Sequence, residues 1–345
     1  MLIIGAGLAG LLAGRTLAAA GWRVVIVEQG RVPGGRLSTP SLGGERFDSG
    51  AQFFSVREPA FAALVDGWKH AGAVSAWSTG FASDDPLVGG AVSLTPAEDG
   101  YARYLVPGGM ARLAEHLASG LEVRCAVTIA RLDVEPGRVS ALAAGAGPER
   151  RFEADAVIVT APVPQALRLL DAGRQARALD AALRARLETV RYAPCLCLLL
   201  GYPRATRAAL PLPGGVRLLH GPIQWLASQR AKGLRTAGEG LVVHAAPDWS
   251  RERIALPEAD RCEQLRREAM AAIVRLCGPG WDEPAESELI VWQHSLATAT
   301  IAEPCLRSDL GAPVVFAGDA FGNKPRVEGA ALSGLAAAQA LVDAP

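Results

Sequence analysis

A glycine-rich turn near the start of the chain constrains the fold more than any other feature. Residues 2–4 are apolar and are expected to form a buried strand, and the next six residues, GAGLAG, lead into a helical stretch that Gly21 can end. A second apolar strand over residues 23–27 ends at Glu28. Strand, glycine turn, helix and strand together make a βαβ unit of the length found in Rossmann-like dinucleotide-binding domains.

This turn has the residues that a bound dinucleotide requires. Its glycines let a pyrophosphate approach the backbone at the helix N-terminus, where unpaired N–H groups and the helix dipole favour anions. Glu28 follows Gly10 by 18 residues and can accept hydrogen bonds from the ribose hydroxyls. A carboxylate there disfavours a 2′-phosphate, so FAD or NAD is expected rather than NADP. The predicted contacts are Gly5, Gly7, Leu8, Ala9, Gly10, Glu28 and Gln29.

Two further segments are expected at the same cofactor. Arg36 follows Gly35 and can neutralise pyrophosphate with its planar guanidinium. Near the end of the chain, Gly318 and Asp319 follow a strand, and Asp319 can accept from a ribityl hydroxyl. A helix then opens at Arg326, Val327 and Ala330, and its first N–H groups can face flavin N1 and O2, where negative charge gathers on reduction. A surface arginine and an ordinary terminal helix are the alternatives.

Composition and charge exclude several other classes of protein. Thirty-five basic residues balance thirty-five acidic ones, so no net field attracts nucleic acid or an anionic membrane. No apolar run approaches the roughly 18 residues of a membrane span. The six cysteines form no C-x-x-C pair, and we expect no metal site; Cys195 and Cys197 are expected to be buried thiols on one face of a strand. A soluble, cytoplasmic protein with a small-molecule substrate is the expectation.

The remaining pattern predicts an α/β fold of two interleaved domains. A Rossmann-like FAD-binding domain is expected from residues 1–58, 105–163 and 288–345, and a substrate domain of mixed antiparallel sheet and helices from residues 59–104 and 164–287. Further helices are expected over residues 61–72, 110–117, 180–189, 258–276 and 327–342. Strands are expected over residues 121–127, 156–160, 195–200, 216–219, 241–245, 289–294 and 314–317, with a hairpin over residues 129–152.

Six motifs together resemble the renalase and flavin-containing amine oxidase superfamily, with the closest likeness to bacterial renalase-like proteins. They are GAGLAG with Glu28, GGR, DSGAQFF, VTAPVP, WQHS and AGDAFGNKPRVEGAALSG, and the resemblance covers nearly the whole chain. It implies that Val127 holds the adenine through its backbone, that Ala51 and Gln52 lie near the isoalloxazine, and that Val327 approaches the pyrimidine edge.

The resemblance also implies an activity. Renalase-like enzymes oxidise the 2- and 6-dihydro isomers of NAD(P), passing hydride to flavin N5 and then electrons to O2, which gives hydrogen peroxide. Such chemistry needs stacked rings and exclusion of water more than an acid or a base. The candidates are Trp292 and His294 as catalytic residues, and Phe53, Phe54, Arg57 and Tyr104 as substrate contacts. Each of these side chains can instead be an ordinary core or strand residue.

Two departures from the wider amine oxidase pattern favour the renalase branch. Many amine oxidases hold a water at flavin N5 with a lysine, and residues 289–301 contain none. Some attach the flavin through a cysteine in the terminal loop, and residues 320–327 contain none, so FAD is expected to be non-covalent. Another FAD-dependent amine oxidase or dehydrogenase, and a non-catalytic flavin-binding redox sensor, stay as alternatives.

Overall fold

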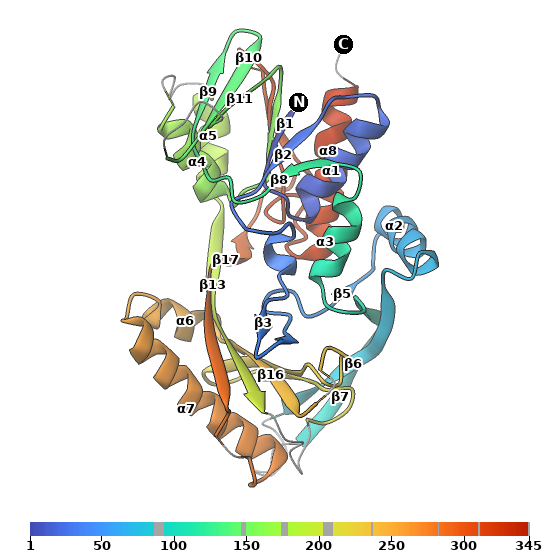
Figure 1. The fold of residues 1–345 in the computed structure, drawn as a ribbon, viewed down its shortest axis with the longest axis vertical. Coiled ribbons are helices and arrows are strands. Elements are labelled where there is room, and N and C mark those ends of the chain that lie inside the picture. Colours follow the sequence, from blue (N-terminus) through green and yellow to red (C-terminus); the bar gives the residue numbers. More distant parts are fainter. Residues whose placement is uncertain are drawn as a thin grey trace. The chain divides into compact units, whose positions relative to one another are not determined.

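The computed structural model describes residues 1–85, 93–145, 150–173, 179–202, 210–235, 237–281, 283–309 and 311–343 (Figure 1). Backbone contacts divide the chain into two compact units, and the chain passes between them several times. The first unit contains residues 1–35, 114–192 and 296–345, and the second contains residues 36–113 and 193–295. The assignment of cofactor and substrate roles to particular ranges stays a prediction.

The first unit is built on a six-stranded, mostly parallel sheet. Its order is β18 (Leu306–Ser308), β19 (Val314–Phe316), β12 (Val157–Val159), β1 (Leu2–Ile4), β2 (Val25–Val27) and β8 (Glu122–Arg124). Only β18 runs antiparallel to its neighbour. The inner strands are continuous apolar runs, as expected for parallel strands that are buried on both faces. The predicted Rossmann-like sheet is therefore confirmed.

Two helices of the first unit, α1 (Leu8–Ala19) and α8 (Val327–Val342), lie side by side (Figure 1). A Cβ at Gly334 would overlap the carbonyl oxygen of Ala9, so this close approach requires glycine. The rest of the unit is an antiparallel sheet, β11 (Arg151–Ala154), β10 (Arg138–Ala143) and β9 (Ile129–Glu135), with α4 (Val163–Asp171) and α5 (Ala181–Leu187). Side chains from β9, β10, α4 and α5 share one apolar core with the parallel sheet.

The second unit is built on an eight-stranded sheet. Its order is β17 (Glu286–Ala299), β13 (Arg191–Tyr202), β16 (Glu239–Ala245), β15 (Ile223–Ser228), β14 (Gly215–Arg217), β6 (Ser75–Asp85), β7 (Ser93–Leu105) and β5 (Phe54–Ser55). A short hairpin, β3 (Ser41–Leu42) and β4 (Glu45–Arg46), precedes it. The helices are α2 (Pro59–His70), α3 (Ala111–Ala118), whose last part belongs to the first unit, α6 (Pro247–Arg253) and α7 (Glu258–Cys277).

Strand β13 shows how this sheet uses its two faces. Leu196, Leu198 and Leu200 lie in an apolar core with Leu265 and Ile273 of α7. The alternate residues Cys197 and Leu199 lie in a second cluster with Phe47 and Val242, and Ile290 and Trp292 pack against it. One face therefore rests on α7, and the other packs against the segment that contains Phe47.

Several sequence predictions about this unit can now be compared with the structure. Cys195 and Cys197 are buried, as predicted, and burial raises the pKa of both thiols. No strand was predicted between residues 72 and 104, where the structure has the long strands β6 and β7. Strand β15 and the helices α4 and α6 were also missed.

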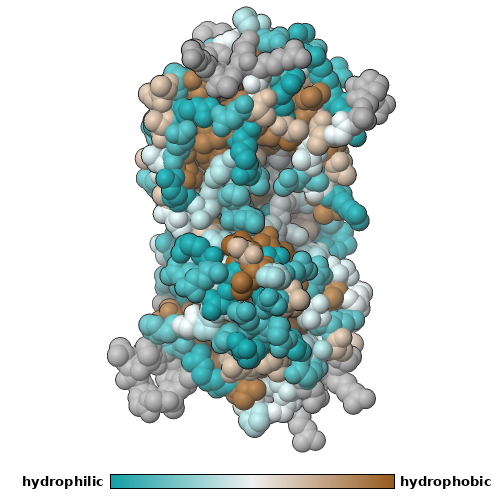
Figure 2. All heavy atoms as spheres, turned by 90° about the vertical axis from the view of Figure 1, so that its left-hand side faces the viewer, coloured by the Kyte–Doolittle hydropathy of each residue, from teal (hydrophilic) through white to brown (hydrophobic). Residues whose placement is uncertain are grey.

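Among the described residues, no helix is both long enough and apolar enough to cross a bilayer. On the face drawn in Figure 2, hydrophilic side chains predominate, and apolar side chains gather only in small groups between them.

Candidate functional site

The glycine turn after β1 has three glycines with different tasks. Gly5 has φ +107°, and a Cβ on it would lie 2.5 Å from Thr160 Oγ1. A Cβ on Gly10 would overlap the carbonyl oxygen of Gly5. In contrast, a Cβ on Gly7 would meet no protein atom within 4 Å. The first and third glycines therefore let the chain turn and pack, whereas Gly7 leaves open the space in front of helix α1.

That space is suited to an anion. Gly7 is the N-cap of α1 and has no side chain with which to cap the first turn, where there is no acidic residue. The first N–H groups of a helix have no partner within the helix, and the helix dipole is positive at this end. A pyrophosphate would satisfy these groups at close range. The turn, including the predicted contacts Leu8 and Ala9, thus fits a dinucleotide, and a side chain at Gly7 would fill the space.

Glu28 lies at the end of β2 and is held beside the same turn. Its Oε2 accepts from the N–H of Ala6 at 2.8 Å, and its Oε1 accepts from the N–H of Gly30 at 2.7 Å. The carboxylate is buried, yet each oxygen keeps a second lone pair for a ribose hydroxyl. The Val127 N–H donates to the Glu28 carbonyl at 2.8 Å, so the two predicted adenosine contacts are neighbours. Gln29, also predicted here, is exposed.

The C-terminal part of the predicted cofactor site also belongs to the first unit. Gly318 follows β19 with φ +138°, and its N–H donates to Ser333 Oγ of α8 at 2.8 Å. Asp319 is buried. Arg326, the N-cap of α8, has φ +136°, a conformation that L residues rarely adopt. This strained turn places Val327 and Ala330 in the first turn of the helix, as predicted.

The first unit thus brings most of the predicted cofactor contacts to one edge of its sheet. Gly5, Glu28 and Gly318 each follow a parallel strand, so they lie at the carboxyl ends of β1, β2 and β19, where open α/β sheets bind ligands. Gly35 lies close to Gly7, because a Cβ on Gly35 would be 3.7 Å from the Gly7 Cα.

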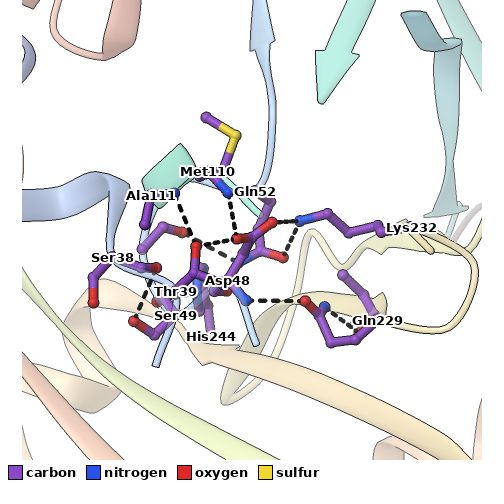
Figure 3. Close-up of polar contacts among 12 residues, drawn as sticks. Ser38, Thr39, Asp48, Ser49, Gln52, Met110, Ala111, Gln229, Lys232 and His244 are labelled. Carbon is purple, nitrogen blue, oxygen red and sulfur yellow. Dashed lines mark hydrogen bonds and ion pairs between the residues drawn. The ribbon is translucent and has the colours of Figure 1, made fainter. Parts of the chain in front are cut away.

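In the second unit, residues 48–52 form a segment whose backbone is held by side chains from distant strands (Figure 3). The Ser49 carbonyl accepts from Trp292 Nε1 and from His244 Nε2, both at 3.0 Å. Because a carbonyl can only accept, His244 Nε2 must carry a hydrogen. Burial lowers the pKa of His244 to about 4, against the hydrogen bond to Ser49, so its imidazole is neutral at pH 7.

Arg36 also holds this region. Its Nη1 donates to the carbonyls of His294 and Ser295 at 3.2 and 3.3 Å, and its own carbonyl accepts from the Ala51 N–H at 2.9 Å. A Cβ on Gly50 would overlap the Arg36 carbonyl oxygen, so the two backbones approach as closely as they can. Arg36 therefore connects β17 with the 48–52 segment, and its predicted contact with pyrophosphate stays a prediction.

An ion pair lies at the centre of the network in Figure 3. Lys232 Nζ donates to Asp48 Oδ2, and the side chains of both residues are only 1% exposed. Lys232 also lies 3.5 Å from Gln52 Oε1, and Gln52 Nε2 donates to the carbonyls of Asp48 and Gly50. Burial lowers the pKa of Lys232, and the charge of Asp48 opposes this shift. Gln52, a predicted flavin neighbour, is thus part of a buried polar network.

The predicted substrate contacts lie in different surroundings. Phe53 packs on the rings of Trp77, Phe81 and Trp225, with centroid distances of 6.3, 4.8 and 5.6 Å. Phe54 is buried and stacks on Tyr104 at 5.6 Å.

Arg57 is exposed. It lies 3.6 Å from the carboxylate of Asp99 and 4.6 Å from the ring centre of Tyr101. The structure therefore places Phe54 in the core and Arg57 in a surface cluster, and their substrate contacts stay predictions.

Sequence reasoning missed Lys232, Asp48 and Gln229 as site residues. The available signal was scarcity, because the chain has lysine only at positions 69, 232 and 324 and otherwise uses arginine. Arginine and lysine are not interchangeable in a buried site, so each of the three lysines was a candidate for a position that needs a compact ammonium, although Lys69 is exposed.

Comparison with known proteins agrees with this geometry. A family model described as flavin containing amine oxidoreductase matches residues 70–342, and one described as NAD(P)-binding Rossmann-like domain matches residues 3–68. A neurosporene-forming phytoene desaturase from Cereibacter sphaeroides is 44% identical over 71 residues, 21% of this chain and 13% of the relative. A phytoene dehydrogenase from Streptomyces griseus is 45% identical over 67 residues, 19% of this chain and 13% of the relative. The matched segment therefore spans only a small part of these curated relatives.

Solved structures show the same fold over nearly the whole chain. A wild-type putrescine oxidase with bound putrescine has a TM-score of 0.71 at 16% identity, covering 99% of this chain and 98% of the other. A cyclohexylamine oxidase from Brevibacterium oxydans IH-35A has a TM-score of 0.70 at 14% identity, with the same coverage. An oxidoreductase from Methanosarcina mazei has a TM-score of 0.67 at 17% identity, covering 97% and 98%.

The structural neighbours share the fold, and the family model covers most of the sequence. The turn at Gly7 and the position of Glu28 fit the dinucleotide cofactor of that family. This chain therefore belongs to the flavin-containing amine oxidoreductase family, whose cofactor is FAD.

Proposed function

We propose that this enzyme is a renalase-like oxidase that removes hydride from the 2- and 6-dihydro isomers of NAD(P). Bound FAD would supply the two-electron acceptor for the hydride and the route of the electrons to O2. In the overall reaction, one dihydronicotinamide, one proton and one O2 give one oxidised nicotinamide and one hydrogen peroxide. The protein has to bind and orient the dihydropyridine ring and exclude water.

The observation that carries this proposal is the state of the buried titratable side chains in the second unit. Lys232 is paired with Asp48, and His244 is neutral and uses its Nε2 hydrogen on the Ser49 carbonyl. An aliphatic amine, with a pKa of about 10, arrives protonated and must lose a proton before it can release hydride. A dihydronicotinamide ring is neutral and needs no such step. Strand β17 also has no lysine with which to organise a water for amine oxidation.

A second candidate is oxidation of an amine. The similar solved structures include a putrescine oxidase and a cyclohexylamine oxidase, and these names favour an amine substrate. At 16% and 14% identity, however, the likeness establishes only the fold. The two candidates differ in whether the substrate must be deprotonated, and this difference can be measured.

The test is anaerobic mixing of the oxidised holoenzyme with candidate donors while the flavin absorbance is followed. We expect 2- and 6-dihydro isomers of NAD(P) to bleach the flavin rapidly. Ordinary 4-dihydro NADH should react about a hundredfold more slowly, because a rigid pocket that sets C2 or C6 over N5 leaves C4 displaced. Admission of O2 should restore the absorbance and give one hydrogen peroxide for each donor oxidised.

Other outcomes would replace the proposal. Rapid bleaching by putrescine or another amine, with a rate that rises as the amine deprotonates, would establish the second candidate. If no donor bleaches the flavin, the remaining alternative is a flavin-binding redox sensor. Asp319→Ala and Glu28→Ala test the cofactor contacts separately, because each should weaken FAD binding about tenfold or more by loss of charge-assisted hydrogen bonds.

A further inference from the structure

The buried pair of Lys232 and Asp48 lies in the second unit and has no part in the reaction proposed above. Asp48 is fully satisfied: its Oδ1 accepts from Thr39 Oγ1 at 2.7 Å and from the Met110 N–H at 2.8 Å, and its Oδ2 accepts from Lys232. Figure 3 shows these three donors converging on one carboxylate. The pair therefore lies at the centre of a buried polar network.

Such a pair is a poor way to gain stability. Removing two charges from water costs free energy that their attraction often fails to repay, and two well-packed apolar side chains of similar size commonly stabilise a fold as well or better. What a hydrogen-bonded ion pair does provide is a fixed geometry, because several directional contacts act on the same two side chains. The role of this pair therefore depends on which backbone and side chains it holds in a fixed position.

It holds the 48–52 segment at both ends. The ammonium of Lys232 binds the side chain of Asp48 and lies within reach of Gln52, and Gln52 in turn donates to the Asp48 carbonyl. These contacts close a ring around the backbone of Gly50 and Ala51. A change at Lys232 would remove the cation from Asp48 and the contact with Gln52 Oε1, and so would loosen both ends of the segment.

The connection between β15 and β16 holds Asp48 through two residues. Gln229, on the same connection as Lys232, is fully buried and accepts from the Asp48 N–H at 3.0 Å. Lys232 Nζ also lies 5.6 Å from the ring centre of Trp77, which contacts Phe53, the residue directly after the segment. The connection thus fixes the segment and the aromatic cluster that follows it.

We propose that Lys232 and Asp48 are a positioning pair for the flavin: they fix the backbone at Ala51 and the side chain of Gln52 and so set the environment of the isoalloxazine ring. The proposal rests on FAD binding and on the prediction that Ala51 and Gln52 lie near that ring. It does not depend on the identity of the substrate, because all of its tests use the flavin alone.

The decisive experiment compares Lys232→Met with Lys69→Met. Lys69 is a matched control in the same unit, since it pairs with Asp66 at 3.1 Å but is 46% exposed. We measure the FAD dissociation constant, the visible spectrum of the bound flavin and its midpoint potential against redox dyes. Lys232→Met should weaken FAD binding at least tenfold and shift both spectrum and potential, whereas Lys69→Met should stay within twofold of the unaltered protein.

Two further variants keep the proposal open to refutation. Lys232→Met leaves a carboxylate buried without its cation and can fail to fold, so Gln52→Leu then decides. This variant keeps the ion pair but removes the contacts of residue 52 with Lys232 and with the carbonyls of Asp48 and Gly50. It should shift the flavin spectrum and potential without changing the unfolding midpoint of the apoprotein by more than a few degrees. Asp48→Asn with Lys232→Met should be no worse than either single change. Unaltered flavin affinity, spectrum and potential in folded Lys232→Met or in Gln52→Leu would overturn the proposal.

Discussion

Gly7→Ala isolates the space in front of helix α1 as the phosphate site. Gly7 has φ −73°, which alanine adopts freely, and its Cβ would meet no protein atom within 4 Å. Loss of a glycine N-cap costs up to about 1 kcal/mol, and the lower entropy of the unfolded alanine chain returns about 0.4–1 kcal/mol. The stability of the apoprotein should therefore change by less than about 1 kcal/mol.

The effect on the cofactor should be much larger. The added methyl group stands where the pyrophosphate has to approach, and loss of one or two charge-assisted hydrogen bonds, each about 1.5–3 kcal/mol, predicts FAD binding weaker by roughly 10- to 10⁴-fold. The assay is titration of apoprotein with FAD, beside urea unfolding of the apoprotein. Gly10→Ala is the contrast, because its Cβ would overlap the Gly5 carbonyl and should destabilise the apoprotein itself. Tight FAD binding by a stable Gly7→Ala protein would refute the placement of pyrophosphate at this turn.

Three further predictions follow from particular contacts. Burial lowers the pKa of His244 in the folded protein to about 4, below the usual 6.5. The free energy of unfolding should therefore be unaffected by His244 above pH 6.5 and should fall as the pH drops from 6.5 towards 4, by at most about 3 kcal/mol. His244→Gln, which can still donate to Ser49, should reduce the difference in apoprotein stability between pH 7 and pH 5; an unchanged difference contradicts this assignment. Gly334→Ala should destabilise the protein by about 1–3 kcal/mol because its Cβ meets the Ala9 carbonyl, whereas Gly67→Ala, whose Cβ meets nothing within 4 Å, should not destabilise it. Cys195 and Cys197 should resist thiol reagents until urea unfolds the protein, and fast labelling of either in the native state would show that the sheet opens.

The dinucleotide turn could be predicted because each of its residues has a local task. Gly5 allows the sharp turn, Gly7 leaves space for a ligand, and Gly10 lets the helix pack closely on the turn before it. All three tasks follow from a few neighbouring residues. The predicted strand and helix bounds there agree with the structure to within two residues. Helix α8 was predicted with its observed bounds, because its run of small residues and the residues at its two ends can likewise be recognised from the local sequence.

The hairpin of β6 and β7 could not be predicted in the same way. Its pairing register shifts between Ala76 and Ser78 and again between Ser78 and Gly80. Each such irregularity reverses the alternation of apolar and polar residues that marks a strand, so the sequence lacks the period of two. The neighbouring strand β14, far away in the sequence, pairs with β6 and makes it part of a larger sheet.

The same limit applies to the candidate site, where residue types could be predicted but their hydrogen-bonding partners could not. Asp48 and Lys232 are 184 residues apart, and Ser49 and Trp292 are 243 apart, so no local pattern relates them. An indole has a single N–H, and that of Trp292 already binds the Ser49 carbonyl. If Trp292 contacts a substrate, it must therefore use its ring and not its hydrogen-bond donor. The predicted catalytic role of Trp292 is therefore restricted to ring stacking. A substrate carbonyl or amide would need a hydrogen-bond donor from another residue of the protein.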